Sequence, residues 1–305
     1  MSFEKIIGNN KIKNELIKAF RTNSIAHSYI FSGQYGIGKK QIAIEFAKMI
    51  LCLNKDNAPC GECKSCLELE NDNNPDFNII KPDGKIKIDQ IRQMLEKVYE
   101  KPIISDKKVY IIDDAETMTV EAQNCLLKTL EEPPEYIVII LITSNESNLI
   151  NTIKSRCLKL TFNPLENSEI KQYLEKNFDF QNVSETMLEI FEGSIGKALK
   201  VKEKQELYNN IETTLSNFSC ESVIDLINNA TEIYKGKENI NEILEYFNIY
   251  FLKKAKEEYN NASKYVKAIE IVEDTKKRLV YNSNYDMTID NLLINIWEEL
   301  NSWKQ

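Results

Sequence analysis

Short β-branched runs and helical patterns alternate through the first 162 residues of the chain. Each run is apolar, brief and bounded by polar or turn-forming residues, which is typical of a buried strand. The five predicted strands are Ser28–Ser32, Phe77–Lys81, Val109–Asp113, Tyr136–Thr143 and Leu158–Phe162. The main helical patterns between them lie near Lys39–Cys52, Ile88–Lys101 and Thr119–Glu132. This order predicts an α/β domain with a mostly parallel sheet and helices on both of its faces.

Beyond Phe162 the patterns are helical only. The shorter predicted helices are Asn167–Lys176, Ser184–Phe191 and Ser194–Leu207. In the last helix, which Thr288 is placed to cap, an apolar stripe consists of Ile289, Leu292, Leu293, Ile296, Trp297 and Leu300. Such a stripe fits either the core of the domain or an interface between subunits. We predict an α/β domain over residues 1–163, a small helical domain over 164–205 and a further helical domain over 206–305.

Composition argues against several classes of protein. The formal net charge is −8, from 39 basic and 47 acidic residues, which disfavours a large basic surface that coats DNA. The longest apolar run, Tyr136–Ile142, is too short to cross a bilayer, and Met1–Asn10 lacks the apolar core of a secretory signal. Seven cysteines without such a signal indicate the reducing cytosol. We therefore expect a cytoplasmic protein.

A glycine-rich segment joins the first predicted strand to the following helix. It contains Gly33, Gly36 and Gly38, and Lys39 comes directly after them. In a P-loop, glycines let backbone N–H groups surround phosphate oxygens, and the lysine reaches the β- and γ-phosphates. Because a strand precedes the segment and a helix follows it, we predict a P-loop fold here rather than a glycine-rich turn that binds nothing.

The residue after Lys39 departs from the P-loop pattern. The pattern requires Ser or Thr, whose hydroxyl binds Mg²⁺, and this chain has Lys40 instead. An ammonium about 4 Å from a divalent ion would be repelled by about 8 kcal/mol at an effective dielectric of about 20. We therefore expect Lys40 to point away from the metal position, and the site to have lost a metal ligand.

Carboxylates follow the third predicted strand, as in a Walker B motif. Asp113 is placed to hold Mg²⁺ through water, and Asp114 stands where a glutamate usually polarises the attacking water. Glu116 is expected in the loop, away from the catalytic line. The alternative is a strand end that merely reaches solvent, and the P-loop upstream weakens it. Since Lys40 and Asp114 both depart from the pattern, we do not expect this chain to hydrolyse ATP, whereas binding of ATP or ADP stays open.

Four cysteines lie close together in the sequence, at Cys52, Cys60, Cys63 and Cys66. Closely spaced cysteines of this kind supply the four soft ligands that tetrahedral Zn²⁺ prefers, with no open position for catalysis. The spacing predicts a structural zinc module over about 52–66. The alternative is four unpaired thiols, which would be open to oxidation. The other three cysteines are expected to pack as small apolar residues, namely Cys125, Cys157 and Cys220.

Taken together, the motifs resemble the clamp-loader subunits of bacterial DNA polymerase III, which belong to the AAA+ family. The resemblance extends over about Ile7–Leu199. It is strongest in Ala26–Gly33, in the cysteine module and in Lys108–Pro134, which holds the specific strings IIDDAETMT and NCLLKTLEEPP. Ser155-Arg156-Cys157 matches the SRC motif of that family. The fold it implies is an AAA+ P-loop domain with an inserted zinc module, then a helical lid domain and a helical collar domain.

Departures from the family pattern favour one type of subunit. The gamma/tau type hydrolyses ATP and would show Lys-Thr or Lys-Ser in the loop and an Asp-Glu pair. This chain instead has Lys40 and the pair Asp113-Asp114, and its segment Gly193–Leu199 is similar to that of the delta-prime type, the stator of the complex. In that role Arg156 would enter a neighbour's ATP site as an arginine finger. Thr143, at the sensor-1 position, would be vestigial.

The resemblance also implies partners. A delta-prime subunit of the DNA polymerase III holoenzyme joins gamma/tau and delta subunits in a hetero-pentameric ring through its collar domain. Through that complex it meets the sliding clamp and primer–template DNA near the nucleoid. Two alternatives stay open: an active gamma/tau-type ATPase, and a zinc-stabilised nucleic-acid-binding adaptor outside any clamp loader. The net charge of −8 weighs against the adaptor.

Overall fold

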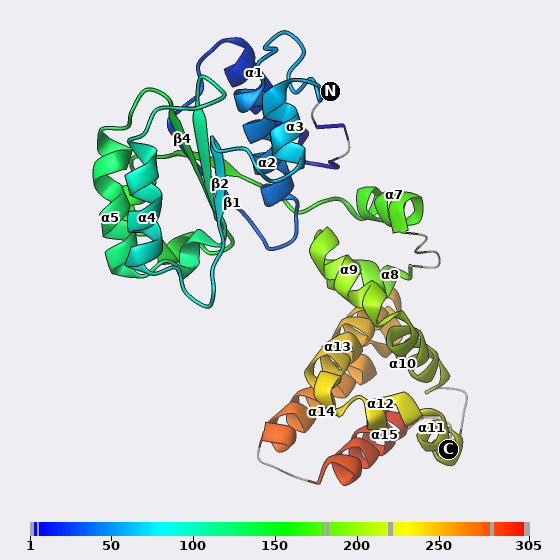
Figure 1. Cartoon of the computed structure of the whole chain (residues 1–305). Coiled ribbons are helices and arrows are strands. Elements are labelled where there is room, and N and C mark those ends of the chain that lie inside the picture. The colour runs from blue at the N-terminus through cyan, green and yellow to red at the C-terminus, as the bar shows by residue number, and fades with distance from the viewer. Residues whose placement is uncertain are drawn as a thin grey trace. The chain divides into compact units, whose positions relative to one another are not determined.

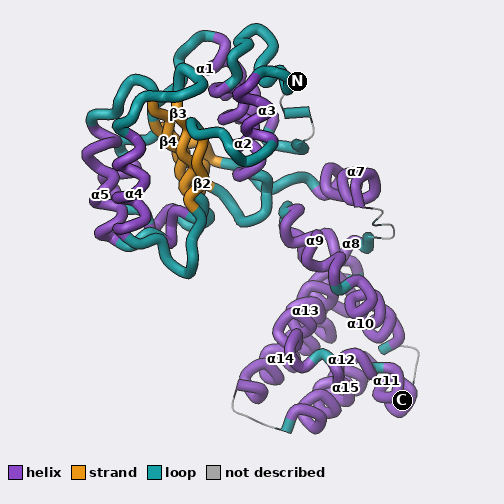
Figure 2. The backbone as a smooth tube through the Cα atoms, in the orientation of Figure 1, coloured by secondary structure: helices purple, strands orange, loops and turns teal. Residues whose placement is uncertain are grey.

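The computed structural model describes residues 3–4, 6–178, 180, 183–218, 222–280 and 284–301. The chain divides into two compact units, which we describe separately: Met1–Asn177 with Gly193–Gly196, and Phe178–Glu192 with Lys197–Gln305. The first is a sheet covered by helices and the second is helical throughout (Figures 1 and 2). The finer division of the helical part at residue 205 stays a prediction.

The first unit is built on a five-stranded parallel sheet in the order β2-β3-β4-β1-β5. Its strands are β1 (Ser28–Ser32), β2 (Phe77–Ile80), β3 (Lys108–Ile112), β4 (Ile137–Thr143) and β5 (Leu158–Thr161). Every predicted strand is confirmed, with ends that differ by at most one residue. β1, β3 and β4 are buried along their whole length, since helices cover both faces of the sheet.

Successive residues of each strand pack against helices on opposite faces of the sheet. Tyr29 and Phe31 of β1 join the core formed with α1, α2 and α3, whereas Ile30 joins the core formed with α4, α5 and α6. Figure 1 shows α1, α2 and α3 on one side of the sheet and α4 and α5 on the other. The helices are α1 (Asn10–Arg21), α2 (Lys39–Leu51), α3 (Lys64–Glu70), α4 (Ile88–Val98), α5 (Val120–Glu131), α6 (Asn151–Lys154) and α7 (Asn167–Phe178). The sequence patterns missed α1, α3 and α6.

The parallel sheet separates two groups of polar residues. The P-loop follows β1, Asp113 follows β3 and Ser144 follows β4, so all three lie at the carboxyl edge of the sheet. Arg156 comes just before β5, and Glu131 ends α5 before β4 begins, so both lie toward the amino edge. Ser28, the first residue of β1, donates a hydrogen bond to the Arg156 carbonyl (2.9 Å). The arginine and the P-loop of this chain therefore lie at opposite edges of one sheet.

The second unit is an assembly of helices around an aromatic core. Its helices are α8 (Glu185–Phe191), most of α9 (Ile195–Glu203), α10 (Gln205–Asn217), α11 (Val223–Asn229), α12 (Thr231–Lys235), α13 (Ile240–Glu257), α14 (Ala262–Val280) and α15 (Tyr285–Asn301). Phe218, Phe247 and Phe251 pack edge to face with ring centroids 6.1–6.4 Å apart. Within the described residues, no helix is long and apolar enough to cross a membrane.

Two predictions for the helical part are wrong in detail. The helix expected over Ser194–Leu207 is interrupted at Lys204, where α9 ends and α10 begins. The last helix begins at Tyr285, so Thr288 lies inside it and its hydroxyl donates to the Asn284 carbonyl (2.7 Å) instead of capping the helix. The apolar stripe belongs to the core of this unit, because four of its members are fully buried, namely Ile289, Leu292, Leu293 and Ile296.

Candidate functional site

The glycine segment forms a loop between β1 and α2, as the sequence predicts. Segment Gly193–Gly196 lies directly against it: the Ser194 hydroxyl donates to the Tyr35 carbonyl (2.9 Å), and the Gly196 N–H donates to the Gly36 carbonyl (3.0 Å). Gly36 has a φ of 77°, and a Cβ there would lie 2.4 Å from the Ser194 hydroxyl oxygen. Glycine is required at this position both by its backbone conformation and by the close contact.

Lys39 is bound to its own loop. Its ammonium donates to the carbonyls of Gly33 and Gln34 and, at 3.3 Å, to the Ser144 hydroxyl. The side chain is buried, and burial lowers the pKa of Lys39, although the charges of Glu116 and the neighbouring aspartates oppose this shift. The lysine that a P-loop directs to phosphate therefore holds the loop together in this structure.

Lys40 does not point away from the metal position. Its ammonium lies 2.7 Å from the Asp113 carboxylate, and the Asp113 side chain is only 15% exposed. The prediction for Lys40 is wrong because the repulsion it considered requires a divalent ion, whereas the carboxylate attracts the ammonium itself. The residues present do not fit Mg²⁺: the hydroxyl ligand is missing, and a cation already occupies the Walker B carboxylate.

Two further carboxylates, Asp114 and Glu116, lie near Asp113. Burial raises the pKa of Asp114, and the nearby charges of Asp113 and Glu116 raise it further, against the two lysines. One oxygen of Glu116 accepts the Ser144 N–H (3.0 Å), which ties the loop after β3 to the end of β4. Its other oxygen is buried and has no hydrogen-bond partner among the described residues.

The four predicted cysteine ligands lie together. Their sulfur atoms are all within 4.8 Å of one another, with 3.6 Å between Cys52 and Cys60 and 4.0 Å between Cys60 and Cys66. A tetrahedral zinc ion with bonds of about 2.3 Å separates its sulfur ligands by about 3.8 Å. The donor set and its spacing therefore fit zinc, and the assignment of the metal stays a prediction.

The cysteines differ in acidity. Burial raises the pKa of Cys63, but hydrogen bonds from the backbone N–H groups of Leu53 and Cys66 outweigh it and bring the pKa to about 6. Burial raises the pKa of Cys66 to about 12. Outside the cluster, burial raises the pKa of Cys157 to about 11, which suits a packing role. Cys125 is half-buried on α5, and Cys220 lies outside the described residues.

A buried polar network, which the sequence analysis missed, attaches the cysteine module to the sheet. Ser65 of α3 contacts Ser105 (3.0 Å) and accepts from Asn74 (3.0 Å), while the Ser105 hydroxyl donates to the last carbonyl of α2 (2.7 Å). Asp76, which is 1% exposed, accepts the N–H groups of Ile103, Ile104 and Ser105. Aspartate in a stretch rich in asparagine gives no sequence signal for such a role.

Arg156 follows α6 and carries its guanidinium at the surface. One terminal nitrogen lies 2.6 Å from the Glu131 carboxylate, and the other donates to the Thr152 carbonyl (2.9 Å). The side chain is 32% exposed. The prediction of an arginine finger concerns a neighbouring subunit and stays a prediction.

Gln123 is a second residue that the sequence analysis missed. It is 2% exposed, its amide group donates to the carbonyls of Met118 and Asn148, and its side-chain oxygen accepts the Ile150 N–H (2.8 Å). It thereby connects α5 to the segment that leads into α6 and Arg156. A single glutamine on the apolar face of a predicted helix, next to Ala122 and Leu126, is the available signal for a buried bridging role.

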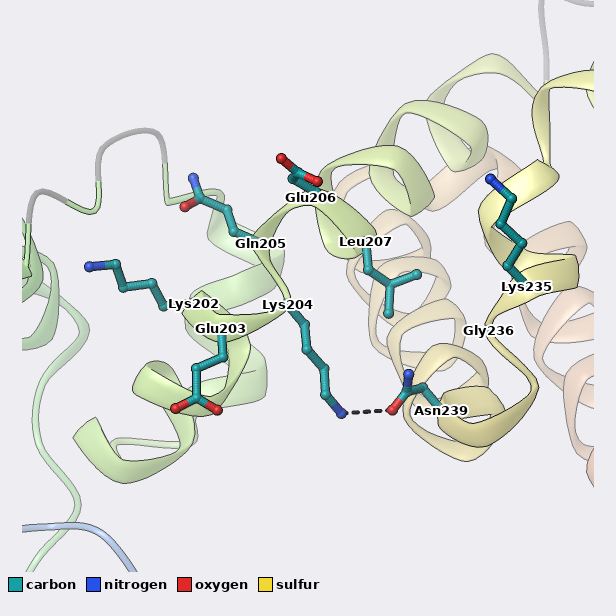
Figure 3. A pocket seen from close by; sticks show the side chains of 9 residues that line it. All are labelled: Lys202, Glu203, Lys204, Gln205, Glu206, Leu207, Lys235, Gly236 and Asn239. Carbon is teal, nitrogen blue, oxygen red and sulfur yellow. Dashed lines mark hydrogen bonds between the residues drawn. The ribbon is translucent and has the colours of Figure 1, made fainter.

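The helical unit contains a pocket of about 560 Å³ (Figure 3). Its lining residues are Lys202, Glu203, Lys204, Gln205, Glu206, Leu207, Lys235, Gly236 and Asn239. Lys204 bonds Asn239 (2.8 Å) and Glu242 (2.7 Å), and the lysines drawn in Figure 3 point in different directions. Because the basic groups do not converge, we assign no ligand to this pocket.

The sheet order, the loop after β1 and the acidic end of β3 define a P-loop protein of the AAA+ class. A family model described as "DNA polymerase III, delta subunit" matches residues 8–166, which is more than half of the chain. The chain therefore belongs to this family of DNA polymerase III clamp-loader proteins.

Individual relatives agree with the family assignment. A DNA polymerase III subunit delta′ of Bacillus subtilis is 38% identical over 165 residues, which are 54% of this chain and 50% of the relative. A DNA polymerase III subunit tau/gamma of Haemophilus influenzae is 35% identical over 210 residues, which are 67% of this chain and 30% of the relative. This chain thus spans half or less of the length of these two relatives.

Among solved structures, a gamma-subunit-related DNA polymerase III protein of Thermotoga maritima aligns over 93% of this chain and 99% of its own length, at 22% identity and a TM-score of 0.49. The fold assignment depends on the order of the strands in the sheet and on the P-loop.

Proposed function

We propose that this chain is a delta-prime-type stator subunit of the DNA polymerase III clamp loader, which helps to load the sliding clamp onto primed DNA without hydrolysing ATP itself. The observation that carries the proposal is the ion pair between Lys40 and Asp113 (2.7 Å). A catalytic P-loop needs a hydroxyl and a free carboxylate for Mg²⁺ at these two positions. Because the hydroxyl is replaced by Lys40 and the Asp113 carboxylate is paired with that lysine, the motor role of a gamma/tau subunit would have no metal site.

Arg156 is the residue proposed to act in catalysis, in the ATP site of a neighbouring subunit. The sheet supports an action in trans, because Arg156 lies at the edge opposite this chain's own P-loop. A guanidinium is permanently charged and offers two parallel donors to phosphate oxygens. It would stabilise the charge that develops on the transferring phosphoryl group.

The cysteine module has a structural role in this proposal. Cys52, Cys60, Cys63 and Cys66 would hold one zinc ion with no position open for a substrate, so the ion would supply cross-linking and no catalysis. The network of Ser65, Asn74 and Ser105 would transmit that rigidity to the sheet. The partners implied are gamma/tau and delta subunits in a ring and, through the complex, the clamp and primer–template DNA.

The test is the clamp- and DNA-stimulated ATPase rate of a loader reconstituted with its cognate subunits. It compares wild type, Arg156→Ala and Lys39→Ala of this chain, with Arg92→Ala as a control for removal of an exposed arginine. We expect a large loss with Arg156→Ala, since an arginine finger contributes about 10³-fold or more to kcat at its site. Lys39→Ala and Arg92→Ala are expected to leave the rate unchanged.

Two outcomes would favour the alternatives. ATP turnover by the isolated chain that is lost with Lys39→Ala would identify a gamma/tau-type motor. Tight, strongly salt-dependent binding of DNA by the isolated chain would identify a nucleic-acid-binding adaptor.

A further inference from the structure

The backbone and the side chain of Arg156 are held in different surroundings, the one inside the fold and the other at the surface. The Arg156 carbonyl accepts the hydroxyl of Ser28, which is 1% exposed, and the Arg156 N–H donates to the Ile153 carbonyl (3.0 Å). The guanidinium, by contrast, is held at the surface by the Thr152 carbonyl (2.9 Å) and by the carboxylate of Glu131 (2.6 Å). The backbone is thus fixed from inside the fold. The charged group is held by two groups of its own segment, the Thr152 carbonyl and the Ser155 hydroxyl (3.3 Å), and by one carboxylate that is accessible to solvent.

Glu131 occupies an unfavourable position unless it has a cationic partner. It is the last residue of α5, where the helix dipole presents partial negative charge, and Glu132 follows it directly. Its side chain is 48% exposed, so neither burial nor packing explains it. Arg156 is the cation that the fold brings to this helix end. The ion pair therefore relieves the unfavourable charge of Glu131 at the helix end and also holds the Arg156 guanidinium.

We propose that Glu131 is a clasp for Arg156: it holds the guanidinium in the free subunit, and the phosphate oxygens of a neighbour's nucleotide must displace it when the subunits assemble. This proposal depends on the proposed function, because Glu131 can compete with a neighbour's phosphate only if Arg156 acts as an arginine finger. In the free chain Glu131 takes one terminal nitrogen of Arg156 and the Thr152 carbonyl takes the other. Phosphate oxygens that bind both nitrogens would therefore have to displace Glu131. Glu131 is thus a positioning residue: its carboxylate competes with the phosphate of the neighbour's nucleotide for the Arg156 guanidinium.

The first experiment measures the clasp in the full-length chain alone. Phenylglyoxal modifies accessible guanidinium groups, and mass spectrometry reports the rate at Arg156, with Arg21 as an internal reference. We expect phenylglyoxal to modify Arg156 about two- to fivefold faster in the Glu131→Gln variant than in wild type, which is the range for loss of a partly exposed ion pair. Glu132→Gln, the matched control one residue along the chain, is expected to match wild type. Equal rates in Glu131→Gln and wild type would overturn the clasp.

The second experiment measures the competition in the reconstituted loader. Removing a ground-state competitor strengthens the binding of substrate and transition state alike, so Glu131→Gln should lower KM for ATP about two- to fivefold and leave kcat unchanged. A merely structural role of Glu131 would instead lower kcat or raise KM. An unchanged or raised KM would overturn the proposed competition even where the phenylglyoxal rates differ.

The two proposals fail in different ways. If Arg156→Ala leaves the stimulated ATPase rate unchanged, the arginine-finger function is wrong, and the competition with a neighbour's nucleotide is wrong with it. Suppose that Arg156→Ala abolishes the stimulated ATPase rate, but that phenylglyoxal modifies Arg156 no faster in Glu131→Gln than in wild type. The arginine-finger function then stands, and only the clasp is overturned.

Discussion

The cysteine module and the P-loop are two candidate ligand sites in the same unit, and they have diverged in opposite directions. The cysteine module keeps a complete donor set, with four sulfur atoms within 4.8 Å of one another. The P-loop keeps its shape but has replaced a metal ligand by a cation, the ammonium of Lys40 beside Asp113. The first site has a donor set that fits an ion, whereas the second has filled the place of an ion with its own side chain.

The difference shows that a motif can keep its backbone shape after it has lost the ligands for its chemistry. The P-loop is held by the protein's own groups, because Lys39 bonds the loop carbonyls and Ser194 and Gly196 bond the loop from outside. The four thiols have no charged internal partner of this kind. They hold one another by weak S–H···S hydrogen bonds, such as that from Cys52 to Cys60 (3.6 Å), whereas a metal would bind all four as thiolates. The comparison predicts that metal removal damages the cysteine module and leaves the P-loop unaffected.

The largest effect is expected from loss of the metal. Purified chain should contain about one zinc ion, and Cys63→Ser should lose it and lower Tm by about 10 °C, because metal binding of this kind is coupled to folding. Elemental analysis and a thermal melt measure both quantities. Cys125→Ser, a cysteine on α5 outside the cluster, is the control and should keep the ion. Metal-free chain with the Tm of wild type would contradict the assignment.

A smaller effect is expected when the P-loop residue is restored. Lys40→Thr returns the hydroxyl ligand and frees Asp113, so Mg²⁺ should strengthen the binding of a fluorescent ADP analogue about tenfold, or about 1.4 kcal/mol. In wild type, Mg²⁺ should have no such effect, since the ammonium occupies the carboxylate. Titrations with Mg²⁺ and with EDTA measure the difference, and Lys48→Thr, a lysine near the end of α2, is the control. Strong Mg²⁺-dependent binding by wild type would refute the replacement of the ion.

The smallest effect concerns the carboxylates that share the P-loop region. The pKa of Asp114 is raised above its ordinary value of 3.8, so its contribution to stability is present below about pH 3.8 and is lost as the pH rises through the folded-state value. Asp114→Asn removes this loss, and asparagine tolerates the left-handed backbone at this position (φ 45°). Urea unfolding from pH 4 to pH 7 should show the variant gaining stability relative to wild type as the pH rises. A difference that is constant with pH would argue against the shift.

Local sequence patterns predicted much of the fold of the first unit. The five strands of the first unit were predictable because each is a short apolar run between polar residues, and the P-loop and the cysteine cluster because their members are close in sequence. Helices α1, α3 and α6 were missed, and so was the break at Lys204 in the helix expected over Ser194–Leu207. A one-residue interruption leaves the helical period of the flanking residues intact, so the sequence pattern does not reveal it.

The sequence alone determined the five strands, the phosphate-type loop, the loss of the loop hydroxyl at Lys40 and the thiol donor set, because each depends on residues that are close together in the chain. The order of the strands in the sheet came from the tertiary structure. Only the tertiary structure decided which charges meet: Lys40 with Asp113, and Arg156 with Glu131. The two partners of each pair belong to different elements, and the parallel crossovers bring them together at one edge of the sheet: the carboxyl edge for Lys40 and Asp113, and the amino edge for Arg156 and Glu131. Because an ion pair depends on distances of a few ångströms between side chains, no pattern of residue types along the chain could choose among the many available carboxylates.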